Sequence, residues 1–157
     1  MFRPRHLILL AVAVVAAWFA LRSVSATASR MPPDPAQVHR QILALLDHGA
    51  KAWDAGNLDD FLSDYLPDSE TTFITKTGVL HGVDAIRGVY AARFAPGAQR
   101  DSLHFQSVEV DILAPDVVNT IAWYVLTRGD SITARGPTSL VIRRVNDRWR
   151  IVHDHSS

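Results

Sequence analysis

The apolar residues of the chain follow a helical spacing at first and a strand-like spacing later. From Ala36 onward they recur every three or four positions, which places them on one side of a helix. Gly56 can end that helix, because glycine readily adopts the left-handed conformation found after a helix C-terminus. The stripe consists of Val38, Ile42, Leu45, Leu46, Gly49, Ala52 and Trp53. We therefore expect an amphipathic helix from residue 36 to residue 55.

Two shorter helices and a hairpin are predicted before residue 95. Asn57 can cap the segment LDDFLSDYL, and Pro67 ends it because proline breaks helical hydrogen bonding. The acidic residues of this region, which we expect to face solvent, are Asp59, Asp60, Asp64 and Asp68. The segments TTFITKTG and VLHG have the composition of two short strands around a turn. Helical spacing returns from Asp84 to Phe94.

Strands are predicted from Ser102 to the end of the chain, because β-branched and aromatic residues dominate there. The turn signals between them are Pro115-Asp116, Gly129-Asp130, Gly136-Pro137 and Asn146-Asp147. In the first strand the apolar alternation changes phase between Phe105 and Val108, which one extra residue near Ser107 would explain. We therefore expect a β-bulge at that point.

The strands at residues 117–127 and 139–145 are apolar in both phases, so both faces of the predicted sheet need cover. Three helices followed by a curved antiparallel sheet predict an α+β fold with the helices packed on one face. A second copy of the chain is the simplest cover for the other face. We therefore expect a homodimer through the sheet face, and strands buried by their own twist are the alternative.

The first 28 residues have the features of an export signal. A basic start, MFRPRH, precedes an uncharged apolar run at residues 7–21. Ala26 and Ala28 have the spacing that signal peptidase recognises, which predicts cleavage after Ala28 and a periplasmic or secreted protein. A retained inner-membrane anchor facing the periplasm is the alternative, since the run approaches the roughly 20 residues that span a bilayer. Residues 29–35 are expected to form a stiff proline-rich linker.

Composition narrows the classes of function. The 157 residues include 16 basic and 16 acidic side chains, and this balance argues against a nucleic-acid-binding face, which needs excess positive charge. The absence of cysteine excludes disulfides, thiol nucleophiles and thiolate metal sites. We predict no nucleic-acid partner and no cofactor, and contact with a membrane only if the leader is retained.

Three segments resemble SnoaL-like and calcium/calmodulin-dependent kinase association-domain-like members of the nuclear transport factor 2-like superfamily. They are AWDAGNLDDFLSDYLPDS, GVLHGVDAIRGVYAARF and RWRIVHDHSS, and the resemblance extends from about Gln37 to Ser157. It implies a SnoaL-like domain at residues 36–157, with a cone-shaped, cystatin-like fold whose curved sheet wraps around the first helix and leaves a pocket at the wide end. It also implies frequent dimers. It implies no particular reaction, because the superfamily includes both enzymes and pure association modules.

The terminal strand carries the densest polar group, formed by His153, Asp154 and His155. Regular alternation would place both histidines on the face of Trp149 and Ile151, and Asp154 on the opposite face. His155 or His153 would then be a general base at the mouth of the cone, with Asp154 as a third catalytic candidate. The alternative is that all three tie the last strand to its neighbours by hydrogen bonds. A metal site on the two histidines would need a third donor, and no metal is predicted. The candidates for that donor are His81, His104 or an acid.

Several aromatic residues and one arginine make a candidate ligand-binding set. Tyrosine and tryptophan can present a polar group inside an apolar cavity. The set consists of Trp53, Tyr65, Phe73, Tyr90, Trp123 and Arg143. Core packing is the alternative for the aromatic members, and only one of Trp123 and Tyr124 can face inward. One of Arg143 and Arg144 could likewise bind an anionic ligand inside the cone.

These observations predict an exported SnoaL-like protein that binds a small hydrophobic molecule, with acid-base catalysis of the isomerase or hydrolase type as one form of that function. The alternative is a non-catalytic homodimeric association module with a vestigial pocket. An apolar pocket with a few inward polar groups would favour the first function. A pocket filled by Trp and Phe side chains would favour the second.

Overall fold

The computed structural model describes residues 34–157. The predicted leader at residues 1–28 and most of the predicted linker lie outside the described residues. Within residues 34–157, no helix is both long enough and apolar enough to cross a membrane.

Three helices form where their capping residues predict them. They are α2 (Pro35–Ala55), α3 (Leu58–Leu62) and α4 (Val83–Phe94). Gly56 ends α2 in the left-handed conformation, with φ 70°, and the Asn57 side chain caps α3 by accepting a hydrogen bond from the Asp60 amide at 3.1 Å. α3 is shorter than predicted, because the chain leaves the helix so that Tyr65 can pair with Ile151.

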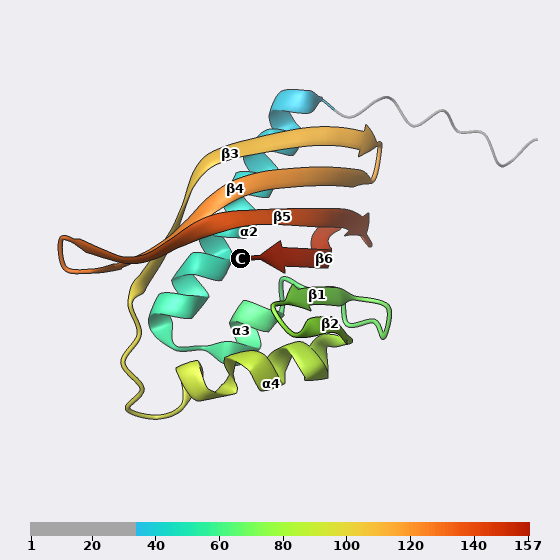
Figure 1. Ribbon diagram of the computed structural model, residues 1–157. Helices are drawn as coiled ribbons and strands as arrows, with labels where there is room; N and C mark the ends of the chain where they lie inside the picture. The colour runs from blue at the N-terminus through green and yellow to red at the C-terminus, as the bar shows by residue number, and fades with distance from the viewer. Residues whose placement is uncertain (1–33) are drawn as a thin grey trace, which may run out of the picture. The chain divides into compact units, whose positions relative to one another are not determined.

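Six strands form a single sheet (Figure 1). They are β1 (Thr72–Thr75), β2 (Gly78–His81), β3 (Ser102–Ala114), β4 (Val117–Arg128), β5 (Ser131–Val145) and β6 (Arg148–Ser156). Their order is β2-β1-β6-β5-β4-β3. All neighbours are antiparallel except β1 and β6, which run parallel. The last strand therefore lies in the middle of the sheet, next to the first hairpin.

The hydrophobic core lies between the inner face of the sheet and the helices. Ile42 of α2, Ile86 of α4 and Ile142 of β5 are fully buried there. Trp149 of β6 is also buried, and its indole N–H donates a 2.8 Å hydrogen bond to Gln41 of α2, which fixes the long helix against the sheet. The predicted α+β architecture, with three helices on one face of a curved sheet, is confirmed.

The predicted β-bulge in β3 is confirmed. β3 gains one residue relative to β4 between Gln106 and Glu109. Ser107 lies at that point with φ 51°, a conformation that a regular strand does not contain. The phase change in the sequence therefore corresponds to a real irregularity in the sheet.

A second bulge, in β6, was not predicted. Ile151 and His153 pair with adjacent residues of β5, so Val152 between them has no partner. The side of β6 that faces the core consequently changes phase at this residue. Trp149 and Ile151 are buried before the bulge, and Asp154 is buried after it.

The predicted turn at Gly136-Pro137 is wrong, because β5 continues through both residues. Gly136 pairs with Tyr124, and Pro137 pairs with Trp123. Proline is tolerated because β6 ends beside it, where its carbonyl accepts a 3.2 Å hydrogen bond from the Ser157 amide and no donor is required. The result is a long central strand that reaches past the end of β6.

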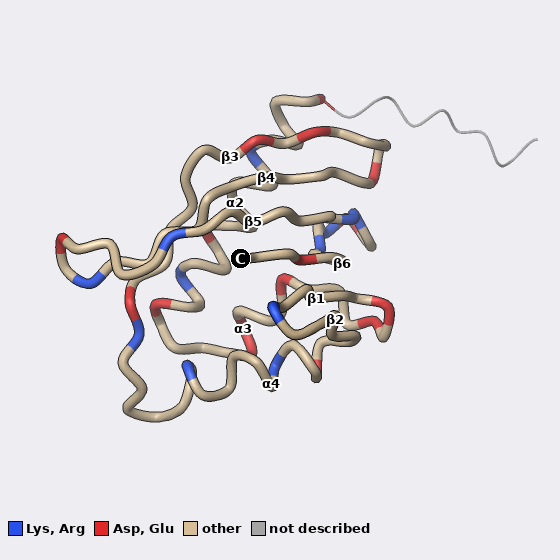
Figure 2. The backbone as a smooth tube through the Cα atoms, in the orientation of Figure 1, with Lys and Arg blue, Asp and Glu red and all other residues tan. Residues whose placement is uncertain are grey.

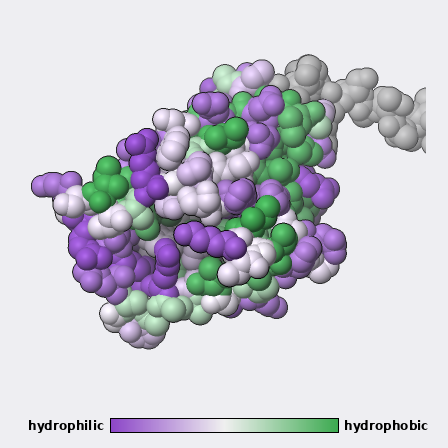
Figure 3. Space-filling model, in the orientation of Figure 1, coloured by the Kyte–Doolittle hydropathy of each residue, from purple (hydrophilic) through white to green (hydrophobic). Residues whose placement is uncertain are grey.

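The face of the sheet turned away from α2 carries exposed apolar side chains. Ile121 and Trp123 of β4 are 45% and 38% exposed. Figure 3 shows apolar patches between polar side chains in this view. Charged positions lie mostly toward the edges, with acidic residues on β3 and basic residues around the β5–β6 turn in Figure 2.

Candidate functional site

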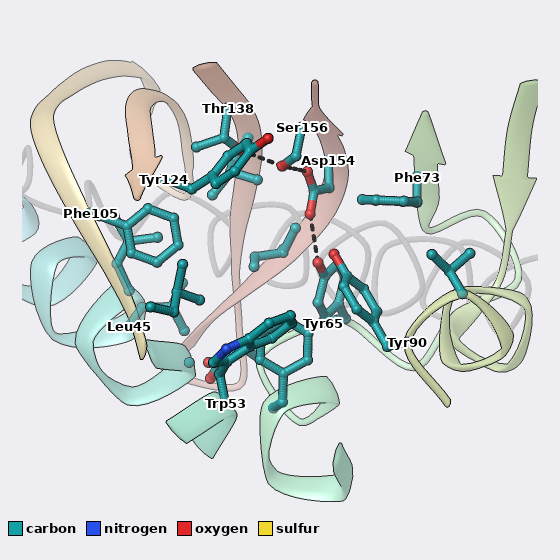
Figure 4. Close-up of a pocket in the computed structure, with 18 of the residues that line it drawn as sticks. Leu45, Trp53, Tyr65, Phe73, Tyr90, Phe105, Tyr124, Thr138, Asp154 and Ser156 are labelled. Atoms are coloured by element: carbon teal, nitrogen blue, oxygen red, sulfur yellow. Dashed lines mark hydrogen bonds between the residues drawn. The ribbon is translucent and has the colours of Figure 1, made fainter. Parts of the chain in front are cut away.

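A cavity of about 300 Å³ lies between the inner face of the sheet and the three helices (Figure 4). Most of its lining is apolar or aromatic, including Leu45, Trp53, Phe61, Phe73, Phe105 and Leu140. Trp53 and Phe61 pack edge to face, with ring centroids 5.7 Å apart, so the aromatic wall holds a defined shape. Val89 of α4 belongs to the lining and is 42% exposed, which marks the side that opens to solvent.

One buried carboxyl group faces this cavity. Asp154 of β6 is 4% exposed, and both of its oxygens accept hydrogen bonds. The Tyr65 hydroxyl donates to Oδ2 at 2.6 Å, and the Ser156 hydroxyl donates to Oδ1 at 2.7 Å (Figure 4). The hydroxyl of Thr138 lies 2.8 Å from that of Ser156 and extends the network along the wall. The carboxyl group is thus held in one orientation by two hydroxyl donors, one from the segment after α3 and one from β6.

The setting of Asp154 alters its acidity. Burial raises the pKa of its carboxyl group above the usual 3.8, because an apolar environment disfavours the charged form. The hydrogen bonds from Tyr65 and Ser156, and the nearby His153 and His155, oppose this increase without cancelling it. A carboxyl group with a raised pKa gains and loses a proton closer to neutral pH than a solvated one, which suits acid-base chemistry.

Two phenols accompany the carboxyl group. Burial raises the pKa of Tyr65 and of Tyr90, and the negative charge of Asp154 raises both further. Both hydroxyls therefore stay protonated in the range where proteins function. Figure 4 shows the two hydroxyls side by side, pointing toward Asp154. Protonated phenols at this place can donate hydrogen bonds to a carbonyl or hydroxyl oxygen of a bound molecule.

The two histidines of the terminal strand do not line this cavity. The bulge at Val152 reverses the predicted phase, so the expectation that His153 and His155 share the face of Ile151 is wrong. His153 lies 2.6 Å from the Thr72 hydroxyl through its Nδ1, which joins β6 to β1, and His155 is exposed. Asp154 is the member of this group that reaches the cavity.

The other candidate residues divide between the cavity and the surface. Trp53, Tyr65, Phe73 and Tyr90 all line the cavity. Trp123 and Arg143 lie outside it: Trp123 is on the outer face, where the Arg135 guanidinium lies 4.7 Å from its ring centroid, and Arg143 is exposed. Tyr124 faces inward in place of Trp123, as strict alternation along β4 requires.

A second acidic residue of the lining, Asp64, was expected to face solvent, and this expectation is wrong. Asp64 is 5% exposed and lies 2.9 Å from Nδ1 of His48, whose Nε2 lies 3.3 Å from Asp60. The hydrogen bond to Asp64 raises the pKa of His48. The negative charges of Asp64 and Asp60 raise it further, because they favour the charged form of the imidazole. The pKa of Asp64 is also raised, because burial outweighs the opposing effect of His48. The sequence did contain a signal for this burial, because Asp64 follows the buried Phe61 by three positions and so lies on the same side of a helical turn.

Sequence reasoning missed further lining residues, among them the polar side chains of Thr138 and Arg93. Thr138 was concealed by the predicted turn at Gly136-Pro137, which hid the continuity of β5. Arg93 had a usable signal, because it follows Val89 by four positions and Tyr90 by three on the same helix. Within residues 34–157, no cluster of three or more histidine or acidic side chains has the geometry of a metal site.

The comparison with known proteins agrees with this architecture. The SnoaL-like domain family matches residues 42–157, and the chain belongs to this family. A nuclear transport factor 2-like protein of unknown function from Shewanella oneidensis is 25% identical with a TM-score of 0.67, over 76% of this chain and 98% of that chain. No curated protein matches the sequence.

Two further solved structures extend the likeness. A protein from Thiobacillus denitrificans, provisionally assigned as a calcium/calmodulin-dependent protein kinase type II association domain, is 29% identical with a TM-score of 0.62, over 73% of this chain and 91% of that chain. A cystatin-like protein of unknown function from Nostoc punctiforme is 13% identical with a TM-score of 0.64, over 75% of this chain and 88% of that chain. The predicted resemblance to the nuclear transport factor 2-like superfamily is thereby confirmed.

Proposed function

We propose that this SnoaL-like protein binds a small hydrophobic molecule in the cavity and orients it by a hydrogen-bonding group at Asp154. The observation that carries this proposal is the buried carboxyl group of Asp154, tied to Tyr65 and Ser156, on the wall of a mostly apolar cavity. Its volume of about 300 Å³ lies at the lower end of the range for small-molecule sites, roughly 300 to 1,000 Å³. A molecule of one or two rings with a carbonyl or hydroxyl group matches that space.

The open cavity supports this function over the alternative of a vestigial pocket. A vestigial pocket would be closed by its own aromatic side chains, whereas Trp53, Phe73 and Tyr90 stand around this cavity (Figure 4). Apolar surface left unfilled inside a domain loses packing contacts, so a bound molecule would stabilise the fold.

The test is native mass spectrometry of the protein purified from cell extract under non-denaturing conditions. A reproducible additional mass on the folded protein is expected, and solvent extraction then identifies the molecule. Ala134 is a half-buried lining residue, so Ala134→Phe narrows the cavity and should abolish the additional mass. A wild-type protein that carries no additional mass, and that binds none of a panel of small aromatic ketones and alcohols, would contradict the proposal.

Acid-base chemistry on the bound molecule is the second step of the proposal. The raised pKa of Asp154 supports a role in moving a proton, and the protonated hydroxyls of Tyr65 and Tyr90 could stabilise negative charge on a neighbouring oxygen. This combination suits an isomerase or a hydrolase. Incubation of the extracted molecule with the protein in D₂O should give deuterium incorporation or a product. Asp154→Asn should bind the molecule but lose at least about 100-fold in rate, the usual contribution of a general base. Equal rates would show that Asp154 is not the base, and no exchange or product with the wild type would leave a binding protein only.

We also propose that two copies pair through the outer face of the sheet. The exposed Ile121 and Trp123 on that face support this arrangement, because burying them would remove apolar surface from water. Sedimentation velocity should give a dimer for the wild type and a monomer for Ile121→Lys. Ile132→Lys is the matched control, since Ile132 is 61% exposed near the β4–β5 turn and should leave the dimer intact. A monomeric wild type would contradict this pairing.

Export remains a proposal that rests on residues 1–28. The basic start, the apolar run and the small residues Ala26 and Ala28 support translocation and cleavage. Cell fractionation followed by N-terminal sequencing should give a periplasmic or secreted protein that begins at Ser29. Recovery of the full-length chain in the membrane fraction would favour the anchored form, and recovery in the cytoplasm would contradict export.

A further inference from the structure

Arg93 is the one lysine or arginine among the described residues that line the cavity. It lies on α4, one turn after Val89. Val89 and Arg93 are both exposed to solvent, and both line the cavity. Asp154, by contrast, is 4% exposed. The cavity therefore has a buried end that presents an acid and a solvent-facing end that presents a cation.

The Arg93 guanidinium is held against the cavity wall. Its central carbon lies 5.8 Å from the centroid of the Trp53 ring, a separation at which a cation is attracted to the aromatic face. Trp53 is itself anchored, because its indole N–H donates a 2.8 Å hydrogen bond to the Asp101 carbonyl. The charge also reaches into the cavity, since Arg93 lowers the pKa of the buried Tyr90 against the effect of burial.

Arg93 has no acidic partner within residues 34–157, unlike Arg87 and Arg128. Arg87, six residues earlier on the same helix, pairs with Asp59 at 2.7 Å, and Arg128 pairs with Asp101 at 2.7 Å. The guanidinium of Arg93 forms neither an ion pair nor a hydrogen bond with any described side chain. Its fork of N–H donors is thus available to a planar anion such as a carboxylate or a sulfonate.

We infer that the molecule bound in the cavity is an amphipathic anion whose acidic group pairs with Arg93 at the mouth while its apolar body fills the cavity. This inference rests on the proposed binding function and adds the chemical class and the direction of the ligand. The reverse orientation would bring an anion to Asp154 and leave the apolar body beside a solvated guanidinium, which is unfavourable at both ends. The uncharged end of the ligand therefore faces Asp154 and Tyr65.

Two fluorescent probes with one aromatic skeleton test this inference. Naphthalene-2-sulfonate is anionic, and naphthalene-2-methanol is its neutral counterpart, and both have the two rings that match the cavity. Arg93→Gln should weaken binding of the anionic probe about fivefold, the upper effect of a solvent-exposed ion pair, and leave the neutral probe unchanged. Arg93→Lys should restore part of the loss. Arg87→Gln is the matched control, because Arg87 lies on the same helix outside the cavity lining, and should change neither probe.

The ionic-strength dependence supplies an independent readout. Raising the salt concentration should reduce the difference between wild type and Arg93→Gln, since exposed charges are screened. Equal weakening of both probes by Arg93→Gln would show that Arg93 acts through the packing of Trp53, and no weakening of the anionic probe would show that it does not contact the anion; either result overturns the inference. Binding of neither probe to the wild type would overturn the proposed binding function as well.

Discussion

Tyr65 and Asp154 stand 89 positions apart in the chain and share a 2.6 Å hydrogen bond inside the cavity. Tyr65 belongs to the segment that leaves α3, and Asp154 belongs to the last strand. The same two segments also pair along their backbones, where the Ile151 amide donates to the Asp64 carbonyl at 2.8 Å. The buried polar group of the site therefore depends on the closure of the whole fold.

Removing the Tyr65 hydroxyl should destabilise the protein and raise the pKa of Asp154 further. Tyr65→Phe leaves one carboxylate oxygen buried without its donor, which costs about 1 to 3 kcal/mol in unfolding free energy. Urea denaturation and an NMR pH titration of ¹³C-labelled aspartate would measure both changes. Tyr124→Phe is the control, because the Tyr124 hydroxyl bonds only to the terminal Ser157 carbonyl at 3.2 Å, and less than about 0.5 kcal/mol is expected. Equal losses of unfolding free energy in Tyr65→Phe and Tyr124→Phe would show that the buried hydrogen bond between Tyr65 and Asp154 adds no more stability than the exposed one.

Asp154 should make the protein less stable as the pH rises. Its folded-state pKa lies above the unfolded value of 3.8, so the folded state binds the proton more tightly. This contribution is fully present below pH 3.8 and is lost as the pH rises through the folded-state pKa. Asp154→Asn should therefore show a flatter dependence of unfolding free energy on pH across the acidic range, measured by urea denaturation from pH 3.5 to 8. An unchanged slope would show that the carboxyl group titrates normally.

His48 should contribute stability that fades above neutral pH. Its pKa is raised above 6.5, chiefly by the hydrogen bond to Asp64, so its contribution is fully present below pH 6.5 and is lost as the pH rises through the folded-state value. His48→Gln should remove this part of the pH dependence. His39→Gln is the control, because His39 is an exposed residue of the same helix. A parallel change in both variants would exclude the His48–Asp64 contact as the cause.

Two glycines should respond in opposite directions to alanine. At Gly136 a Cβ would overlap the Ser157 carbonyl oxygen and lie 2.7 Å from the Tyr124 hydroxyl, so Gly136→Ala should displace the chain end and lower the melting temperature. At Gly88, within α4, a Cβ would meet nothing within 4 Å, so Gly88→Ala should add about 0.5 to 1 kcal/mol through helix propensity. Differential scanning calorimetry would measure the melting temperatures of both variants and compare them with that of the wild type. A stabilised Gly136→Ala variant would contradict the tight contact.

Two buried threonines on neighbouring strands should also differ. The Thr120 hydroxyl is buried without a hydrogen-bond partner among the described residues, so Thr120→Val should be neutral or stabilising. The Thr138 hydroxyl lies 2.8 Å from that of Ser156, and Thr138→Val should cost about 1 kcal/mol. Chemical denaturation compares the two variants directly. A destabilised Thr120→Val variant would indicate a partner, such as a buried water, for that hydroxyl.

The fold was largely predictable because its signals are local. Gly56 and Asn57 mark the junction of α2 and α3 by capping chemistry, and the phase slip around Ser107 reveals the bulge in β3. Each signal depends on a few neighbouring residues, so no knowledge of the tertiary structure was needed. The chain order of three helices and a meander then left few arrangements in which the apolar faces could be covered.

The site was less predictable because its decisive features are tertiary. Val152 is apolar and fits either side of a strand, so nothing in the local pattern shows that it is the unpaired residue. Asp64 lies in an acidic segment, and its burial depends on the approach of α2, where a Cβ on Gly49 would lie only 3.1 Å from its carboxylate. Aromatic residues such as Trp53 were correctly placed inside, but whether they surround a cavity or fill it is decided only by three-dimensional packing.

The bulge in β6 also determines how this chain must be compared with its relatives. Counting alternate residues from Trp149 assigns the wrong side to every position beyond Val152, so an alignment that ignores the extra residue would equate His153 or His155 with inward-facing groups elsewhere. In this protein the inward positions of the chain end are 154 and 156. A relative with the same bulge that places an imidazole in the cavity from this part of the strand would carry its histidine at the position equivalent to Asp154 or Ser156.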